Sequence, residues 1–295
     1  MSRLLDPKIL MAIKDLSLVA KTTIDGFMAG MHKSRVKGPG LEFSQYRSYQ
    51  AGDDLRWLDW KMYARSDRYY IRESEIETSI SVRFLIDASG SMNHQDGDFT
   101  KIEYARWLCA SLAYLANLQG DSVGLYIFQD GALFQMPSRK DIQHLARFYY
   151  QLEHIEPAGK FSDPIQYKNI FAGSQKRELL VFVTDFYEEA GEISKLLDVL
   201  ASLGHEILVF HIVGRNEMEF DFDKYSALKD LESGRVISID EQMDRDVYKQ
   251  RIQDHFAKIR MQLLDKHIVY RMLVMDQSLD KALRDFLNQR QKSGI

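Results

Sequence analysis

The chain of 295 residues could form one large domain or two small ones, and its formal net charge is −4. Hydrophobic residues make up 45% and charged residues 28%, which is ordinary globular usage and argues against disordered or fibrous classes. This mildly acidic balance gives no overall attraction to nucleic acid or to anionic membranes. The single cysteine excludes an internal disulfide and a cysteine-based zinc cluster.

The sequence indicates neither a secretory leader nor a membrane span. Lys8, Lys14 and Lys21 interrupt the first segment, so the apolar core of a signal peptide is missing. The longest notable uncharged run, residues 107–120, is well short of the ~20 apolar residues that a spanning helix needs. We therefore expect a cytoplasmic protein.

Residues 8–31 predict an amphipathic helix, because apolar side chains recur there at spacings of mostly three and four. Its few lysines are mixed with aspartates, which favours packing on the domain surface over lying on a membrane. A basic, turn-rich linker follows over residues 32–40.

Residues 41–78 are rich in arginine, aspartate and aromatic side chains, and residues 33–72 contain nine Lys/Arg against five Asp/Glu. Arginine and aromatic residues together can bind nucleic acid. A local ion-pair network is the stronger interpretation, because Asp53, Asp54 and Asp59 lie within a few residues of basic side chains. Asp53 and Asp54 also predict the cap of a short helix around residues 57–62.

The next segment runs from an apolar strand, residues 81–86, into an acidic, hydroxyl-rich turn. Asp87, Ser89 and Ser91 occupy alternate positions of this turn, which the intervening glycine allows to bend sharply. A carboxylate and two hydroxyls at a strand end form an all-oxygen site. Such a site suits a hard divalent cation, Mg²⁺ or Mn²⁺.

Beyond this turn, strands alternate with helices. Thr100 opens a helix with a capping-box pattern, and Asp130-Gly131 marks a hairpin. Mostly apolar strands that alternate with helices predict an α/β fold with a mostly parallel sheet and helices on both faces. Strands are expected at residues 81–86, 123–128, 132–136, 178–184, 205–213, 235–239 and 268–275.

Two strand ends supply the candidate site. Asp87 and Asp185 each follow an apolar strand, and ligands bind outside the carboxyl ends of the strands of such sheets. The loop over residues 157–164 is expected at the same rim, where either Ser162 or Asp163 is a further ligand.

Three functions compete for this site. A metal-dependent phosphohydrolase would use an aspartate nucleophile with a second carboxylate two positions on, but that position is Ser89. No phosphate-binding glycine loop or Gly-x-Ser-x-Gly elbow appears either. We therefore favour a non-catalytic module whose metal captures an acidic residue of a partner. A metal-independent scaffold, in which the aspartates only cap loops, is the second alternative.

The turn at Asp87 resembles the DxSxS element of von Willebrand factor A domains, whose metal-ion-dependent adhesion site adds a threonine and an aspartate from two further loops. The resemblance implies the ligands Asp87, Ser89, Ser91 and Asp185, with Ser162 where threonine is usual.

The segment before it resembles the signature of the bacterial family known as domain of unknown function 58. The resemblance implies a von Willebrand factor A-like domain over residues 79–295 and a family-specific part over residues 1–78 packed on it. It also implies an adaptor or co-chaperone working with a MoxR-type AAA+ ATPase, or with another von Willebrand factor A protein, on a client. The matching residues are Glu42, Phe43, Arg47, Tyr49, Gly52, Asp53, Asp54, Arg56, Asp59, Trp60, Ala64 and Arg65.

Overall fold

The computed structural model describes residues 15–33, 45–50, 58–73, 79–161, 177–188, 190–220, 227–238 and 245–293. The chain divides into two compact units, one formed by Met1–Gly30 with Ser79–Ile295 and the other by Met31–Thr78. The predicted boundary between residues 78 and 79 coincides with one boundary of this division. The two differ at the N-terminus, because the division groups the residues up to Gly30 with the larger unit.

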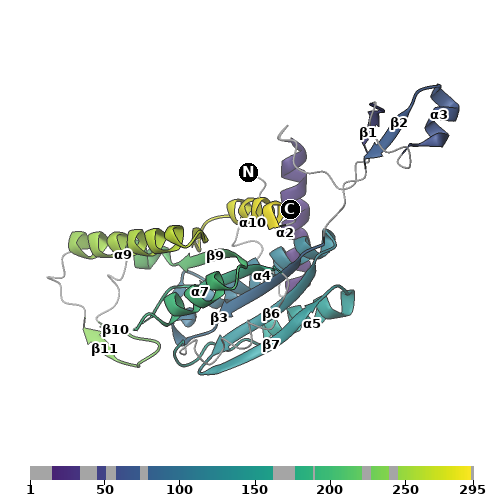
Figure 1. Cartoon of the computed structure of the whole chain (residues 1–295). Helices are drawn as coiled ribbons and strands as arrows, with labels where there is room; N and C mark the ends of the chain where they lie inside the picture. Colours follow the sequence, from purple (N-terminus) through teal and green to yellow (C-terminus); the bar gives the residue numbers. More distant parts are fainter. Residues whose placement is uncertain are drawn as a thin grey trace. The chain divides into compact units, whose positions relative to one another are not determined.

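The larger unit contains a six-stranded sheet in the order β12-β9-β8-β3-β6-β7 (Figure 1). All neighbouring strands are parallel except β7, which runs antiparallel to β6 at one edge. This confirms the predicted α/β fold with a mostly parallel sheet. The strands are β3 (Ser81–Asp87), β6 (Ser122–Gln129), β7 (Ala132–Arg139), β8 (Leu179–Thr184), β9 (Glu206–Val213) and β12 (Val269–Val274).

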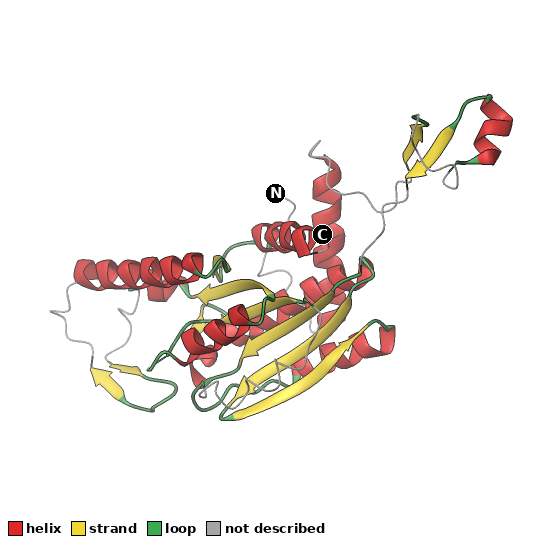
Figure 2. Cartoon of the chain, viewed as in Figure 1, coloured by secondary structure: helices red, strands yellow, loops and turns green. Residues whose placement is uncertain are grey.

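Helices lie on both sides of this sheet (Figure 2), because its strands are apolar on both faces. On one side, Leu85 of β3 belongs to a buried cluster with α7 (Glu192–Ser202) and α9 (Arg245–Asp265). On the other, the neighbouring Phe84 contacts Phe148 of α5, with ring centroids 5.4 Å apart. Each such buried side chain contributes about 1.5–3 kcal/mol relative to exposure. The remaining long helices are α2 (Leu16–Lys33), α4 (Lys101–Leu118), α5 (Ile142–Glu153) and α10 (Asp280–Ser293).

Helix α2 corresponds to the helix predicted over residues 8–31, of which residues 8–14 lie outside the described ranges. Its packing surface is apolar, with Ile24 and Phe27 buried. The indole nitrogen of Trp107 in α4 donates to the hydroxyl of Thr23, at 3.1 Å. The helix therefore packs on the domain, as the spacing of its apolar residues predicts.

Two local sequence signals are confirmed at the level of individual contacts. The Thr100 side chain accepts from the backbone N–H of Glu103 while the Glu103 carboxylate accepts from that of Thr100, which is the predicted capping box. Asp130 and Gly131 both adopt positive φ, 42° and 78°, and connect β6 to β7. Cys109 is fully buried in α4, so it is a packing residue, and burial raises the pKa of its thiol.

Short elements surround the carboxyl ends of the strands. The strand predicted over residues 235–239 is present as β11, but it lies outside the main sheet and pairs antiparallel with β10, which the sequence did not indicate. The short elements are η3 (Gly90–Asn93), β4 (Gln95–Asp96), β5 (Phe99–Thr100), α8 (Arg215–Glu219), β10 (Ala227–Lys229) and β11 (Val236–Ser238).

The smaller unit pairs β1 (Gln45–Ser48) with β2 (Tyr70–Glu73), and its described residues include the short helix α3 (Trp60–Ser66). The prediction that Asp53 and Asp54 cap this helix is wrong, because the cap is Asp59. Its Oδ1 accepts the backbone N–H groups of Lys61 and Met62 at 2.9 and 3.0 Å. A carboxylate one residue before the first helical turn satisfies donors that no intrahelical carbonyl can reach.

Within the described part of the chain, no helix is both long and apolar enough to cross a membrane.

Candidate metal centre

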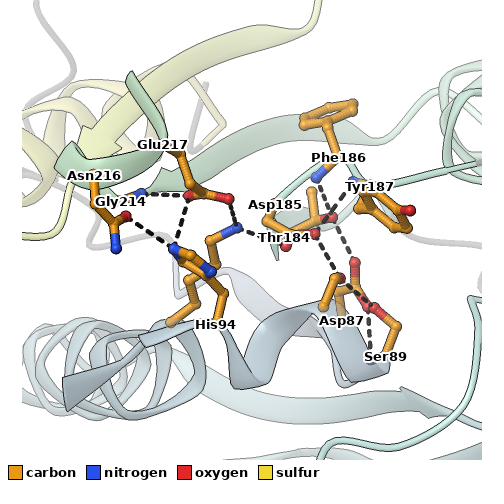
Figure 3. A network of polar contacts seen from close by, with 12 residues as sticks. Asp87, Ser89, His94, Thr184, Asp185, Phe186, Tyr187, Gly214, Asn216 and Glu217 are labelled. Atoms are coloured by element: carbon orange, nitrogen blue, oxygen red, sulfur yellow. Dashed lines mark hydrogen bonds and ion pairs between the residues drawn. The ribbon is translucent and has the colours of Figure 1, made fainter. Parts of the chain in front are cut away.

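The candidate centre lies where β3 and β8 end side by side. The two strands are parallel and paired from Val82 to Ile86, so Asp87 and Asp185, one residue beyond the end of β8, reach the same edge of the sheet. Both side chains are buried, with 0% and 8% of their residue surface exposed. The structure thus brings together the two aspartates that the sequence placed at strand ends (Figure 3).

The two serine hydroxyls connect the aspartates. Ser89 and Ser91 are both buried, and their Oγ atoms lie 3.0 Å apart. Ser91 Oγ donates to Asp185 Oδ1 at 3.1 Å, and the Ser89 backbone N–H donates to Asp87 Oδ1 at 3.0 Å. The alternate spacing in the sequence therefore directs all three oxygen-bearing side chains of the turn toward Asp185.

The turn is held in place by the loop that precedes the predicted third contributor. Gly90 N–H donates to the carbonyl of Gly159 at 2.9 Å, and Ala158 N–H donates to that of Ala88 at 3.0 Å. Ser162 and Asp163 lie outside the described residues, so their roles stay predictions. The described residues just before them, Ala158 and Gly159, do contact the Asp87 turn.

Thr184 orients Asp87. Its hydroxyl donates to Asp87 Oδ2 at 2.6 Å and accepts the backbone N–H of Phe186 at 3.0 Å (Figure 3). Phe186 has φ of 55°, a left-handed conformation that non-glycine residues rarely adopt. The turn after β8 is therefore fixed by the same hydroxyl that positions the Asp87 carboxylate.

Lys101 forms a buried ion-pair network on the other side of Asp185. Its Nζ contacts Asp185 Oδ2 at 2.9 Å and Glu217 Oε1 of α8 at 2.8 Å, and its side chain is only 4% exposed. Burial alone would lower the pKa of this ammonium, but the charges of Asp185 and Glu217 raise it. Lys101 therefore stays a cation inside the site.

The two aspartates consequently differ in acidity. Burial, and then the charge of Asp185, raises the pKa of Asp87 to about 7, although hydrogen bonds from Thr184 and Ser89 oppose this. Burial also acts to raise the pKa of Asp185, but the charge and hydrogen bond of Lys101 outweigh it and lower that pKa. Lys101 neutralises Asp185, whereas no cation among the described residues contacts Asp87.

Glu232, in the turn between β10 and β11, also lies at the site. Burial raises the pKa of its carboxyl to about 7; the hydroxyls of Ser89 and Ser91 lower it, and the charges of Asp87 and Asp185 raise it further. Its Oε1 is buried without a hydrogen-bond partner among the described residues. Buried carboxylate oxygens are normally paired, so this oxygen is available to accept a further contact.

The donor set fits a hard divalent cation. Carboxylate and hydroxyl oxygens are the ligands that Mg²⁺ and Mn²⁺ prefer, and the unpartnered Glu232 oxygen adds a further one. Among the described residues, no group of three or more His, Cys, Asp or Glu side chains is placed to hold a metal. A site here would therefore depend on the two serine hydroxyls as well as on carboxylates.

A cavity of about 380 Å³ opens beside the rim. Ser91, Lys101 and Asp185 line one side, and Tyr248 and Phe256 of α9 line another. His211 also faces it, and burial lowers the pKa of this imidazole to about 3, although the charge of Asp185 opposes the shift. The cavity joins the acidic rim to apolar walls.

The predicted signature residues are placed only in part. Tyr49 and Arg65 lie in the smaller unit, as do the helix cap Asp59 and the exposed Trp60. Arg47 lies in β1. Six others are outside the described residues, namely Glu42, Phe43, Gly52, Asp53, Asp54 and Arg56.

Three residues of the site were missed by sequence reasoning. Thr184 directly precedes Asp185, so its position next to a strand-end aspartate was a usable signal. Lys101 follows the predicted helix cap, a position where the sequence indicates an exposed lysine. Glu232 lies in a turn with no site motif. The last two are brought to the rim only by tertiary structure.

Comparison with known proteins identifies relatives over most of the chain. The uncharacterized protein Rv1480 of Mycobacterium tuberculosis is 27% identical over 259 residues, covering 86% of this chain and 81% of the relative. Among solved structures, BatB from Bacteroides thetaiotaomicron is 20% identical and covers 73% of this chain and 98% of its own, with a TM-score of 0.49. The VWA domain of SpRpn10 is 17% identical and covers 45% of this chain and 75% of its own, with a TM-score of 0.36.

The model of one protein family, "Protein of unknown function DUF58", matches residues 45–258, well over half of the chain. The match covers most of the smaller unit, every strand of the main sheet except β12, and the candidate metal centre. The chain therefore belongs to the DUF58 family, as its arginine- and aspartate-rich segment predicts.

Proposed function

We propose that the chain is a non-catalytic protein–protein interaction module that depends on a divalent cation. The observation that carries this proposal is the convergence of Asp87, Ser89, Ser91 and Asp185 at the carboxyl edge of the sheet. A divalent cation held there would offer a coordination position to an external carboxylate.

The surroundings of the site favour capture over chemistry. Lys101 is held by two carboxylates and so is not available as a base, and His211 is buried with a pKa of about 3. The neighbouring cavity has aromatic walls, which suit an apolar side chain next to the captured carboxylate. These features support binding of an acidic peptide segment of another protein.

The resemblance stated from the sequence supplies the class of partner. Members of the family are commonly encoded beside MoxR-type AAA+ ATPases, so the chain would act as an adaptor or co-chaperone between such an ATPase and a client protein. We place this function in the cytoplasm, together with the proposed magnesium or manganese ion.

A second candidate is a metal-dependent phosphohydrolase, which one observation favours. Asp87 and Glu232 both have pKa values raised to about 7, the range in which a carboxyl group can exchange protons at neutral pH. In that function Asp87 would be the nucleophile and Glu232 the general acid.

Calorimetry with Mg²⁺ and Mn²⁺ on the full chain tests the metal site. We expect wild type to bind one ion. Asp87→Asn should bind the ion more than about 100-fold more weakly, which is a larger loss than changing a residue that only supports a ligand would cause. The purified MoxR-type ATPase of the same organism should then bind wild type in Mg²⁺ but not in chelator.

Two results would contradict the proposal. Absence of metal binding by wild type would exclude the module as stated. Turnover of p-nitrophenyl phosphate that requires Mg²⁺ and disappears in Asp87→Asn would favour the phosphohydrolase instead.

A further inference from the structure

The turn between β10 and β11 packs directly on the Asp87 turn. A Cβ atom added at Gly90 would lie 2.5 Å from the carbonyl oxygen of Leu231, closer than any side-chain carbon can approach. The turn itself is closed by two hydrogen bonds, from Asp230 N–H to the Arg235 carbonyl at 2.8 Å and from Gly234 N–H to the Asp230 carbonyl at 2.9 Å. Glycine at position 90 thus allows a second, distant turn to cover the site.

Two further contacts hold the backbone of the turn at Glu232. The Asp230 carboxylate accepts the backbone N–H of Glu232 at 2.9 Å through Oδ1. Its Oδ2 accepts the hydroxyl of Tyr187 at 3.0 Å. Tyr187 lies two residues after Asp185, so the turn is tied to the loop after β8 as well as to Gly90.

The Glu232 carboxyl group is thereby placed among the proposed ligands. Glu232 directly follows Leu231, whose carbonyl oxygen lies against Gly90, the residue between Ser89 and Ser91. Its Oε1 is buried and unpartnered among the described residues. Lys101 compensates Asp185, so burying the Glu232 oxygen beside the Asp87 carboxylate is costly unless a further cation compensates these two.

We propose that Glu232 is itself a ligand of the cation at this site and occupies the position that a partner's carboxylate would otherwise take. This inference rests on the proposed metal-dependent binding function. The turn over residues 230–235 is then an internal substitute for the partner, and an acidic segment of the partner must displace Glu232 to bind.

The test uses Mn²⁺ alone as the probe on the full chain, in wild type, Glu232→Gln and Glu219→Gln. Glu219 is an acidic residue of α8 that pairs with Arg215 at the surface, so it is a matched control. Calorimetry gives the Mn²⁺ affinity, and water-proton relaxation gives the number of water molecules bound directly to Mn²⁺. Circular dichroism melting confirms that each variant is folded.

We expect Glu232→Gln to bind Mn²⁺ about tenfold or more weakly and to carry one additional bound water, because a carboxylate ligand is lost. Glu219→Gln should match wild type in both measurements. Glu232→Ala should repeat the effect of Glu232→Gln, which guards against a residual amide ligand.

Unchanged affinity and hydration in Glu232→Gln, with Asp87→Asn still abolishing binding, would overturn this inference and leave the proposed function standing. Failure of wild type to bind Mn²⁺ would overturn both. The two failures are therefore distinguished by the same set of titrations.

Discussion

The two halves of the candidate metal centre differ in how the charges of their carboxylates are compensated. In one half, the buried Asp185 and the partly exposed Glu217 flank Lys101, whose ammonium contacts both at 2.8–2.9 Å. In the other, Asp87 and Glu232 have raised pKa values, and no protein cation contacts either among the described side chains. The Lys101 half is complete by itself, whereas the Asp87 half has the composition of a site that requires an external cation.

The largest effect should come from removing the protein's own cation. Lys101→Met removes the ammonium from the buried Asp185 and the partly exposed Glu217, and breaking a buried ion pair typically costs about 3–5 kcal/mol in the free energy of unfolding. Urea denaturation measures this loss. The Lys101→Met substitution would leave both halves without a protein cation, so added Mg²⁺ should restore more stability to this variant than to wild type.

Arg215→Met is the matched control, because Arg215 pairs with Glu219 and Asp276 at the surface. Exposed pairs contribute about 0–1 kcal/mol, so little change is expected. A Lys101→Met variant as stable as this control would show that Asp185 and Glu217 are not compensated by Lys101.

The pH dependence of stability should separate the halves next. At pH 6.5 in chelator, Asp87 and Glu232 keep their protons in the folded chain, because their pKa values are about 7. The unfolded chain has already released these protons. The folded state then binds more protons, so the free energy of unfolding falls as pH rises from 6.5 to 8. His211, with its pKa of about 3, stays neutral in the folded state across this window.

Thermal melts in chelator and in saturating Mg²⁺ measure this effect. Mg²⁺ keeps these carboxyls ionised in the folded state, so the downward slope should disappear when it is bound. In Asp87→Asn the slope in chelator should be smaller, because one of the two groups is gone. A slope that persists unchanged in Mg²⁺ would contradict the assignment.

A smaller effect is expected from the residue that orients Asp87. Thr184→Val removes the hydroxyl that donates to Asp87 Oδ2 and accepts from Phe186, so Mn²⁺ affinity should fall about tenfold. Thr23→Val makes the same chemical change in α2, at a hydroxyl bonded to Trp107. Calorimetry should show unchanged affinity for that control; equal losses in both variants would point to a general effect on folding.

The smallest effect concerns the attachment of the β10–β11 turn. Tyr187→Phe removes the hydroxyl that donates a hydrogen bond to Asp230. A hydrogen bond to a charged group contributes about 1.5–3 kcal/mol to stability, and this one contributes less because its position is exposed. Mn²⁺ affinity should fall less than in Glu232→Gln. Tyr150→Phe, at an exposed position in α5, should have no effect, and a loss greater than that of Glu232→Gln would contradict the order proposed here.

The difference between the halves also explains what the sequence could predict. Asp87, Ser89, Ser91 and Asp185 were predictable, because a parallel sheet brings the carboxyl ends of neighbouring strands together and alternate spacing directs side chains to one side. The positions of the strands and the hairpin at Asp130-Gly131 followed from apolar runs and turn residues. These inferences need only local pattern and topology.

Lys101 and Glu232 depend on packing that no local pattern encodes. Lys101 stands at the first position of α4, where a lysine ordinarily extends into solvent, and only the approach of α8 encloses it with Glu217. Glu232 reaches the site through a short hairpin outside the main sheet. The cap of α3 was misplaced for a simpler reason, since several aspartates precede that helix and only Asp59 is adjacent to it.

The most direct test is diffraction from crystals grown with Mn²⁺ and measured for anomalous scattering. We predict one anomalous peak at the Asp87 half of the rim, within about 2.3 Å of oxygen atoms from Asp87, Ser89 and Ser91. A peak between Lys101 and Glu217, or no peak at the rim in crystals that contain Mn²⁺ elsewhere, would contradict the conclusion that the Asp87 half is built for an external cation.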